Sequence, residues 1–336
     1  MKVVVYDPRA ADAASAVRGI GRYLQLLHES LPQSTRFVND IQDALDADIF
    51  INPFFNVIQY PLFTKRIAKK QIAIIHDLIP LKYPRDFPLG MRGRFAVFRN
   101  KQSLGMYDLI VTDSDASKND IIKILGVPEN VIHVIYPCLS KRLTTTAHFT
   151  PGVLKKVAKP YVVYVGDATA NKNLLVTAAA IKHAAVTAVF VGKTFGQPVV
   201  DHPWTAHLKK FKQITENDDR FIFPGFVTDE ELTYIYKNAA ANILLSTDEG
   251  FGFSYLEAAA CKTPSLLSDR PIFHETAADT ALFTKPTDPE EAAGLIKLLV
   301  TEKKMRDELG EKAYERSKIY SEDQFTKDWK NVLKAE

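Results

Sequence analysis

The 336-residue sequence has few cysteines, little net charge and no long apolar run. Cys138 and Cys261 lie far apart, each among apolar residues, which argues against a disulfide framework or a cysteine-based zinc site and predicts two buried thiols. No stretch approaches the roughly eighteen consecutive apolar residues of a membrane-spanning helix. The opening sequence MKVVVYDPR contains an apolar run too short for a signal peptide, so we expect a cytoplasmic protein.

The charge balance limits the class of partner. Lysine and arginine number 43 and aspartate and glutamate number 40, which leaves a formal net charge of +3. This excess is too small to indicate nucleic acid as the main ligand. Hydrophobic residues make up 46% of the chain, the composition of a globular protein with a substantial core. Because 336 residues exceed the size at which a single core keeps growing, we expect two domains.

Short β-branched runs alternate with segments of helical period along the whole chain. Such alternation predicts parallel strands joined by helical crossovers, with each sheet buried on both faces. The fold class is therefore α/β, with two doubly wound, Rossmann-like domains. The predicted strands are residues 3–6, 49–51, 72–75, 109–111 and 133–135 in the first half, and 161–165, 188–191, 243–245, 265–267 and 282–283 in the second.

The domain boundary is predicted where this alternation lapses, in a stretch rich in Thr, Lys and Pro at residues 139–160. We expect an N-terminal domain over residues 1–157 and a C-terminal domain over residues 158–318. The end of the chain, residues 319–336, is predicted to form a further helix that returns to the N-terminal domain. This helix needs a surface because its apolar residues recur every four positions, and its first residues resemble a capping box. The apolar residues are Phe325, Trp329 and Leu333, and the capping box is Ser321 with Gln324.

One loop carries the clearest chemistry, within the segment STDEGFGFSYLEAAACKTP at residues 246–264. A buried strand before the loop and a helix after it place TDEGFGF at the carboxyl end of a parallel strand, where open α/β sheets bind ligands. The two glycines of the loop allow backbone N–H groups to approach a ligand closely. Glu249 and Glu257 flank this turn. The alternatives are a solvated loop charge for Glu249 and a capping box with Ser254 for Glu257.

Three other segments carry candidate residues. In YVVYVGDATANKNLL, Lys172 lies near a helix N-terminus and suits a diphosphate, or else faces solvent. In IAIIHDLIPLKYP, His76 and Asp77 follow a buried strand, either as a functional pair or as a structural hydrogen-bonded couple. In VRGIGRYLQLL, Gly19 and Gly21 open a predicted helix but lack the spacing of a dinucleotide-binding fingerprint.

Two basic segments in the first half suggest a surface function. They are KRIAKK at residues 65–70 and RDFPLGMRGRFAVFRNK at residues 85–101, in which Phe and Met alternate with Lys and Arg. Such segments either form a solvated basic face beside an acceptor site or rest on an anionic membrane.

The run FIFPGFVTDEELTYIYKNAAANILLSTDEGFGFSYLEAAACKTPSLLSDRPIFHETAADTALF, at residues 221–283, closely resembles the donor-binding half of glycosyltransferase family 4. Members of that family are retaining enzymes of the GT-B architecture, and the resemblance extends more loosely over nearly the whole chain. It implies two Rossmann-like domains that face each other across a cleft and close on the substrates. It also implies that Glu249 and Glu257 form the family's Glu-x7-Glu motif.

The same resemblance implies a role for each candidate residue. Glu257 would bind the ribose hydroxyls of a sugar nucleotide, and Glu249 would bind hydroxyls of the sugar. The backbone of Gly225, Phe226 and Val227 would contact the base, and the backbone of Phe251, Gly252 and Phe253, with Ser254, would lie near the sugar. Lys172, Asn171 and Gly19 would lie at the phosphates, with Gly21 supporting the turn at Gly19. His76, oriented by Asp77, would lie beside the sugar.

The sequence departs from the family in one respect. Many members carry an arginine at the position of Asp167 or Asn171, which supplies a second cation for the phosphates. Lys193, which follows the next predicted strand, is the first candidate to replace it. The alternatives are Arg9, Arg18 and Arg22.

The function implied by the resemblance is transfer of a hexose from a nucleoside diphosphate sugar, a UDP- or GDP-hexose, to a hydroxyl of a glycan or lipid-linked acceptor, with an α-linkage. No cofactor is expected, and no metal, because the DSD run at residues 113–115 is interpreted as a helix cap. The alternatives are a sugar-nucleotide epimerase and a non-catalytic partner subunit of a transferase. The presence of Glu249, Glu257, Lys172 and His76 together favours an active transferase over a non-catalytic subunit.

Overall fold

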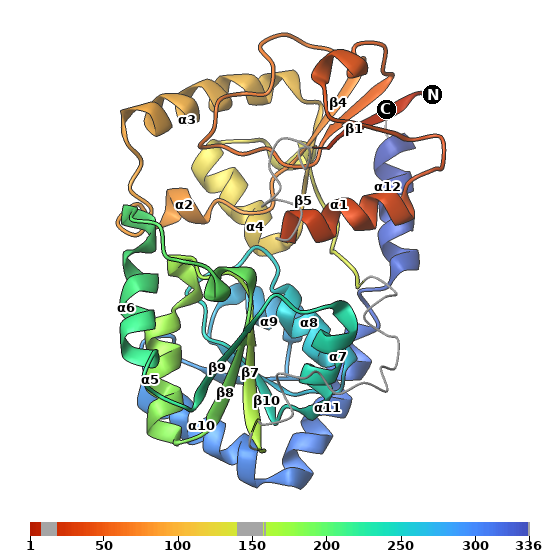
Figure 1. The fold of residues 1–336 in the computed structure, drawn as a ribbon. Helices are drawn as coiled ribbons and strands as arrows, with labels where there is room; N and C mark the ends of the chain where they lie inside the picture. Colours follow the sequence, from red (N-terminus) through yellow and green to blue (C-terminus); the bar gives the residue numbers. More distant parts are fainter. Residues whose placement is uncertain (8–18, 140–156, 158, 335–336) are drawn as a thin grey trace. The chain divides into compact units, whose positions relative to one another are not determined.

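The chain divides into two compact units in the computed structural model, which describes residues 1–7, 19–139, 157 and 159–334 (Figure 1). Unit 1 consists of Met1–Cys138 and Tyr320–Glu336, and unit 2 of Leu139–Ile319. The terminal helix therefore belongs to the unit built from the first half of the chain. Most of the linker expected at residues 139–160 lies outside the described residues.

Unit 1 is built on a six-stranded parallel sheet with the order β2-β1-β3-β4-β5-β6. The strands are β1 (Val3–Tyr6), β2 (Arg36–Val38), β3 (Ile49–Asn52), β4 (Lys70–Ile74), β5 (Leu109–Thr112) and β6 (Ile132–Val134). The helices are α1 (Gly19–Ser30), α2 (Ile79–Lys82), α3 (Met91–Ser103), α4 (Asp115–Asp120) and α12 (Glu322–Lys334).

The strand predictions for this unit hold except at one edge. β1, β3, β4 and β5 are almost continuously buried, as their unbroken apolar runs predict. β2 was not predicted, because it is an edge strand of three residues in which only Val38 is buried. A half-exposed strand of this length leaves little periodicity in the sequence.

Helix α12 completes the core of unit 1. Its Phe325 and Trp329 side chains are 1% and 0% exposed, which confirms the predicted apolar stripe. The Phe325 ring meets Tyr23 of α1 edge-on, with a centroid distance of 5.7 Å. At the start of the helix, the Gln324 backbone N–H donates to Ser321 Oγ at 3.2 Å, whereas the Gln324 side chain bonds Asp328. Only the Ser321 half of the predicted capping box is therefore present.

Unit 2 repeats the plan with a six-stranded parallel sheet in the order β12-β11-β10-β7-β8-β9. Its strands are β7 (Tyr161–Val165), β8 (Thr187–Val191), β9 (Phe221–Gly225), β10 (Ala241–Leu244), β11 (Ser265–Ser268) and β12 (Leu282–Thr284). Its helices are α5 (Leu174–Ala184), α6 (Ala206–Thr215), α7 (Asp229–Asn238), α8 (Phe253–Ala260), α9 (Pro271–Ala277), α10 (Pro289–Thr301) and α11 (Lys303–Ser317).

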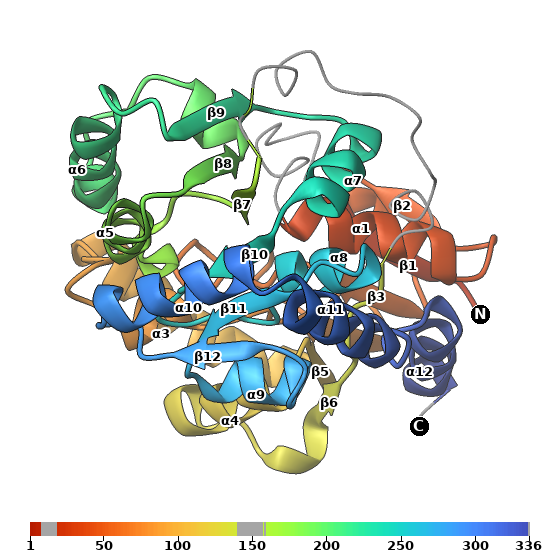
Figure 2. The same ribbon diagram turned by 90° about the horizontal axis from the view of Figure 1, so that it is seen from below.

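Helices cover both faces of this sheet. Figure 2 shows α5, α6 and α10 packed together on one face and α7, α8 and α11 on the other. The chain runs outward from β7 through β8 to β9, then returns to place β10 on the other side of β7. The strand order therefore reverses between β7 and β10. In open α/β sheets this switch point, at the carboxyl ends of the strands, is where ligands bind.

Glycines allow the loops that leave the carboxyl ends of β7, β8 and β9 to lie against one another. The Gly166 N–H donates to the Val191 carbonyl at 3.0 Å, and the Gly192 N–H donates to the Gly225 carbonyl at 3.2 Å. A Cβ atom on residue 192 would lie 2.2 Å from the Gly166 carbonyl oxygen. Any side chain at this position would therefore push the first loop away from the second.

Gly192→Ala should accordingly destabilise unit 2 by about 1–3 kcal/mol, because the clash is with backbone and not with a flexible side chain. For a unit of this size that loss lowers Tm by about 2–4 °C per kcal/mol. Gly294→Ala is the matched control, since Gly294 lies inside α10 with no atom within 4 Å of the added Cβ. It should stabilise the protein by about 0.5–1 kcal/mol. Equal thermal melts for Gly192→Ala and the parent would contradict the close packing of these loops.

Candidate active site

The switch point of unit 2 brings together two residues that lie 77 positions apart. Lys172 ends a short 3-10 helix, Ala170–Lys172, in the segment after β7, and Glu249 lies in the loop after β10. The Lys172 Nζ donates to Glu249 Oε1 at 2.6 Å and to Oε2 at 2.7 Å. Both side chains are largely buried, with exposed fractions of 18% and 9%.

Glu249 is further fixed by its own loop. Ser246 Oγ donates to Glu249 Oε1 at 2.7 Å, so the carboxylate accepts three hydrogen bonds. A carboxylate offers about four acceptor sites, and a lysine ammonium carries three N–H donors. The pair therefore keeps acceptor capacity on Glu249 and donor capacity on Lys172 for a ligand. Sequence position alone allowed a solvated charge at either residue, and their burial contradicts that alternative.

Hydrogen bonds pin the two loops to each other. The Asn171 side chain donates to the Asp248 carbonyl at 3.0 Å, and the Thr247 N–H donates to the Asn171 carbonyl at 2.7 Å. The Asn173 side chain donates to the Leu245 carbonyl at 2.9 Å. The Asn171 side chain, predicted to bind donor phosphate, is thus committed to the β10 loop, which it holds beside Lys172.

Glu257 is buried in α8 and is not part of a capping box. The helix begins after Gly252, and no side chain caps it, so Glu257 lies two residues beyond the position that a capping-box glutamate occupies. Its exposed fraction is 3%, and its Oε2 accepts a hydrogen bond from the Tyr236 hydroxyl of α7 at 2.9 Å. The capping-box alternative with Ser254 is therefore wrong. Tyr236 was not anticipated, because its partner lies 21 residues away on another helix.

The turn between Glu249 and Glu257 requires its second glycine. Gly252 has φ of +90°, a conformation that side chains other than glycine rarely adopt, and an added Cβ would lie 3.1 Å from the Phe273 ring. Phe251 is 3% exposed and meets Phe253 edge-on at a centroid distance of 5.5 Å. Buried rings thus anchor the turn, and Ser254 is buried behind it.

The remaining unit 2 candidates lie at the ends of β8 and β9. Gly225, with φ of +75°, turns the chain so that Phe226 is 68% exposed and Val227 partly exposed. Lys193 is exposed and starts a 3-10 helix, Lys193–Gly196. Asp167 accepts a hydrogen bond from the Thr194 hydroxyl at 2.7 Å, which fixes the loop after β7 to this helix.

In unit 1, His76 is held by two acceptors at the end of β4. Its Nδ1 lies 2.7 Å from Asp113 Oδ2, and its Nε2 lies 3.0 Å from the Pro53 carbonyl oxygen. Both ring nitrogens therefore face oxygen acceptors, an arrangement that favours the doubly protonated imidazolium. The Tyr23 ring packs edge-on against it at 4.8 Å.

Asp113, and not Asp77, orients His76. Asp77 Oδ1 accepts from the Ile79 N–H at 3.0 Å, so this carboxylate serves the backbone of α2. In the DSD run, Ser114 is the predicted helix cap, accepting from the Ser117 N–H at 3.0 Å, whereas Asp113 is 4% exposed and serves the histidine. The adjacency of β4 and β5 in the sheet, which brings their ends together, was the signal that could have identified Asp113.

The pKa of His76 lies above its ordinary value because the effects that raise it outweigh the effect of burial, which lowers it. Burial lowers the pKa, but the Asp113 carboxylate, the Pro53 carbonyl and the charge of Asp77 together raise it by more. The imidazolium is therefore more stable in the folded than in the unfolded chain. Its contribution to stability is fully present below pH about 6.5 and is lost as the pH rises through the folded-state pKa.

Asp113→Asn should lower the pKa of His76 below its ordinary value, because burial then dominates. The pH titration of the His76 Cε1–H resonance by NMR measures this shift directly. Asp77→Asn is the matched control, since it removes a neighbouring charge that makes no hydrogen bond to the ring. A His76 titration unchanged by Asp113→Asn would show that Asp113 does not hold the imidazolium.

The remaining predictions for unit 1 concern helix α1 and three arginines. The described part of α1 is Gly19–Ser30, and Gly21 is buried within it. Arg22 lies on the same helix, whereas Arg9 and Arg18 fall outside the described residues.

Among the residues that the structure describes, there is no group of three or more His, Cys, Asp or Glu that could hold a metal ion. None of the described helices combines the length and the apolar character needed to cross a membrane.

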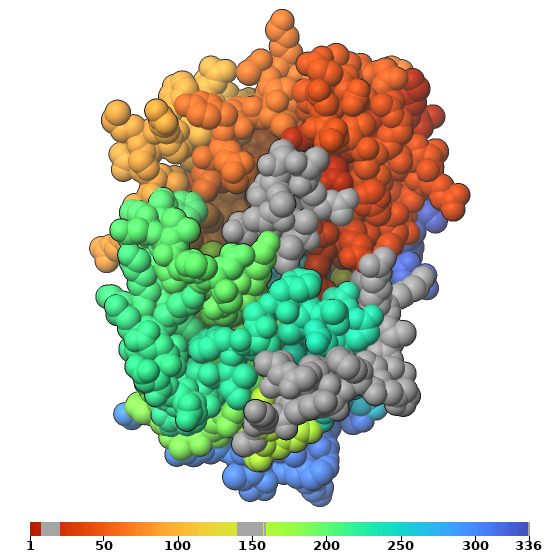
Figure 3. All heavy atoms as spheres, in the orientation of Figure 1, coloured from red at the N-terminus to blue at the C-terminus, as the bar shows by residue number. Residues whose placement is uncertain are grey.

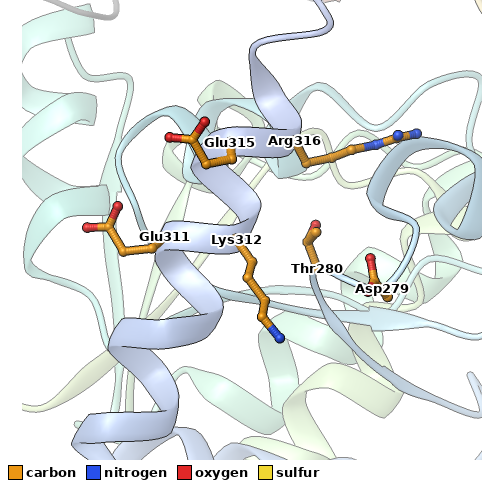
Figure 4. A pocket seen from close by; sticks show the side chains of 6 residues that line it. All are labelled: Asp279, Thr280, Glu311, Lys312, Glu315 and Arg316. Carbon is orange, nitrogen blue, oxygen red and sulfur yellow. The ribbon is translucent and has the colours of Figure 1, made fainter.

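An open hollow of about 490 Å³ lies elsewhere on unit 2 (Figure 4). It is lined by Asp279, Thr280, Glu311, Lys312, Glu315 and Arg316. None of the candidate residues at the switch point contributes to it. The Arg316 guanidinium donates to the backbone carbonyls of Glu275 and Thr276 at 2.9 and 3.1 Å, so this basic side chain has a structural role.

Comparison with known proteins identifies relatives for both the sequence and the fold. Residues 149–316, half of the chain, match the family model described as glycosyl transferases group 1. The O-antigen chain mannosyltransferase RfbU of Salmonella typhimurium is 28% identical over 234 residues, which cover 69% of this chain and 61% of the relative. The chain thus spans less than two thirds of the length of that relative.

Solved structures match over nearly the full length. HepE from Anabaena, in complex with UDP-glucose, superposes with a TM-score of 0.71 at 17% identity and covers 99% of both chains. WaaG, a glycosyltransferase involved in lipopolysaccharide biosynthesis, superposes with a TM-score of 0.71 at 14% identity and covers 99% of this chain and 100% of its own. The fold is that of GT-B glycosyltransferases, with two Rossmann-like domains.

Proposed function

Because this chain belongs to the glycosyl transferases group 1 family, we propose that it is a retaining glycosyltransferase, of the kind grouped in glycosyltransferase family 4. It moves a hexose from a UDP- or GDP-hexose to a hydroxyl of a glycan or lipid-linked acceptor and forms an α-linkage. The observation that carries this proposal is the buried Lys172–Glu249 pair at the switch point of unit 2. The pair places a cation and a hydroxyl-binding carboxylate where α/β sheets bind ligands.

The relatives support the proposed donor and acceptor classes. RfbU is named an O-antigen chain mannosyltransferase, and HepE was solved with UDP-glucose. A third relative, 32% identical over 119 residues, is the alpha-monoglucosyldiacylglycerol synthase of Streptococcus pneumoniae. Glycans and glycolipids are thus the acceptor classes that we propose for this chain.

Each switch-point residue has a role in the proposal. Lys172 binds the donor diphosphate, assisted by the N-terminal amides of α5, and neutralises charge that grows as the diphosphate departs. Glu249 holds hydroxyls of the sugar, and Glu257, oriented by Tyr236, holds the ribose hydroxyls. The exposed turn at Gly225, Phe226 and Val227 contacts the base.

We propose that configuration is retained by attack from the face that the diphosphate leaves. The bond from C1 to the diphosphate oxygen breaks, the acceptor oxygen bonds C1 on the same face, and the acceptor proton passes to the departing phosphate. Glu249 does not act as a nucleophile in this scheme, because its carboxylate is engaged by Lys172 and Ser246. His76 borders the donor sugar and transfers no proton, because both ring nitrogens are already hydrogen-bonded. As part of the same proposal, Gly19 lies nearest the donor phosphates and Gly21 supports that turn.

A panel of sugar nucleotides tests this function against its rivals. UDP- and GDP-hexoses are supplied with and without glycan acceptors, and both diphosphate release and thermal stabilisation are measured. A transferase gives acceptor-dependent diphosphate release; an epimerase converts the donor without acceptor; a non-catalytic subunit is stabilised without turnover. Stabilisation by no sugar nucleotide would overturn the proposed function.

The two lysines at the site should differ in their contribution to diphosphate binding. Lys172→Met should weaken binding of UDP or GDP about 10–100-fold, because a charge-assisted contact in a largely buried position is lost. Lys193→Met should weaken it only about 2–5-fold, since Lys193 is exposed and its charge is screened by solvent. Calorimetric titration of both variants measures the difference. If Lys193→Met has the larger effect, the phosphates do not lie at Lys172.

A further inference from the structure

Helix α3 of unit 1 carries a stripe of exposed apolar side chains. Met91, Phe95 and Phe98 are 89%, 52% and 56% exposed. Their spacing of four and three residues places them on one face of the helix. The Phe95 ring also lies 6.3 Å from Tyr60, which is 61% exposed. Exposed aromatic residues that cluster in this way, unlike scattered ones, indicate a binding surface.

The opposite face of α3 fixes the direction of this stripe. Ala96, Asn100 and Ser103 are buried and recur with the same spacing of four and three residues. The Asn100 side chain donates to the Asn56 and Val57 carbonyls at 3.3 and 3.1 Å, which anchors the helix to unit 1. The apolar stripe therefore points away from the core. Figure 3 shows the α3 segment, in orange-yellow, at the surface of unit 1.

Basic residues flank the stripe on both sides. At about 100° per residue, Arg92 and Arg99 lie along one side and Arg94 and Lys101 along the other. The three arginines are exposed, and none of their side chains has a hydrogen bond or ion pair with any residue in the described part of the chain. The helix has no acidic residue. The face thus combines an apolar centre with two unneutralised basic margins.

The second basic segment does not share this property. Arg66 pairs with Asp108, Lys69 pairs with Asp48 at 2.8 Å, and Lys70 donates to the Val332 carbonyl at 2.9 Å. Three of the four basic residues of the run at 65–70 therefore bond to other residues of unit 1. Of the two basic segments, only the one that contains α3 combines exposed apolar side chains with exposed arginines on one face.

We propose that the outer face of α3 binds the surface of an anionic phospholipid bilayer. The aromatic and methionine side chains enter the region between headgroups and acyl chains, and the arginines contact lipid phosphates and anionic headgroups. This inference concerns attachment to a membrane and goes beyond the transfer reaction. Its test uses vesicle binding, so that its failure is separate from a failure of the proposed function.

Co-sedimentation of the full chain with vesicles tests the proposal. Vesicles of phosphatidylglycerol and phosphatidylcholine in equal parts should bind the protein at about 0.1 M salt, and pure phosphatidylcholine vesicles should bind it at least about tenfold more weakly. The triple variant Arg92→Glu/Arg94→Glu/Arg99→Glu should lose about a hundredfold in affinity, at about fivefold per removed basic charge. The double variant Phe95→Ser/Phe98→Ser should lose about tenfold or more.

Matched controls separate this face from general charge and apolar effects. Lys210→Glu/Lys297→Glu/Lys304→Glu changes the net charge equally at exposed positions of unit 2, and Leu298→Ser/Ile319→Ser removes exposed apolar groups there. Both should bind anionic vesicles within about threefold of the parent. Equal binding by the arginine variant and its control would overturn the proposal. Self-association that Phe95→Ser/Phe98→Ser abolishes, in an ultracentrifuge and without vesicle binding, would assign the face to a second copy instead.

Discussion

Replacing Glu249 by alanine should lower the rate of sugar transfer about a thousandfold or more, while affinity for the free nucleoside diphosphate stays within about threefold of the parent. The reason is that Glu249 would hold hydroxyls of the transferred sugar and not the nucleotide. Loss of these contacts misplaces C1 relative to the acceptor, and small errors in that geometry have large effects on rate. Steady-state kinetics, together with calorimetric titration of UDP and GDP, measures both quantities.

Two further variants distinguish a direct loss of activity from a loss of folding. Glu249→Ala leaves the largely buried Lys172 ammonium without its partner, which costs about 3–5 kcal/mol in comparable buried pairs. Glu249→Gln keeps an acceptor for Lys172 and Ser246 and should lose activity to a similar degree with a higher Tm than Glu249→Ala. Asp248→Asn is the matched control, because it removes the neighbouring carboxylate of the same loop and should retain near-parental transfer. Turnover by Glu249→Gln close to the parent would refute the role of Glu249.

Replacing Glu257 by glutamine should weaken binding of UDP or GDP about 10–100-fold, because hydrogen bonds between a carboxylate and two ribose hydroxyls are lost. In contrast to Glu249→Ala, the maximal rate at saturating donor should change little. Glutamine preserves the size of this buried side chain and an acceptor for the Tyr236 hydroxyl. The variant should therefore remain folded.

Tyr236→Phe provides the matched control for this second result. It removes the hydrogen bond that orients Glu257 but keeps the carboxylate, so nucleotide affinity should fall only about 3–10-fold. If Glu257→Gln binds nucleotide as tightly as the parent, the buried Glu257–Tyr236 contact serves the packing of α7 against α8 and not a ligand.

Much of the fold follows from the local sequence. Strands such as β7 and β10 are buried on nearly every residue, and this condition produces apolar runs that are visible without a structure. The prediction that both cysteine thiols are buried is also confirmed, because Cys138 and Cys261 are 1% and 8% exposed. Burial raises the pKa of Cys261 to about 12. β2 could not be predicted because two of its three residues face solvent or lie half-buried at the sheet edge.

The site residues were predictable only where loop and strand order determine their position. Lys172 and Glu249 follow strands that are neighbours in the sheet, so their loops meet at one edge. The partners Asp113 and Tyr236 were missed because they reach His76 and Glu257 through packing between elements far apart in sequence. The apparent capping box at Ser254 was misleading because Gly252, with a positive φ, begins the helix two residues earlier. The outward direction of the α3 stripe likewise depends on which face Asn100 anchors.

The most direct test of the proposed donor site is a crystal structure of the full chain with bound UDP or GDP. We expect the diphosphate within hydrogen-bond distance of Lys172 Nζ at the switch point of unit 2 and the ribose hydroxyls at the Glu257 carboxylate. Density for the nucleotide elsewhere, with Lys172 and Glu257 making no contact to it, would contradict the proposed donor site.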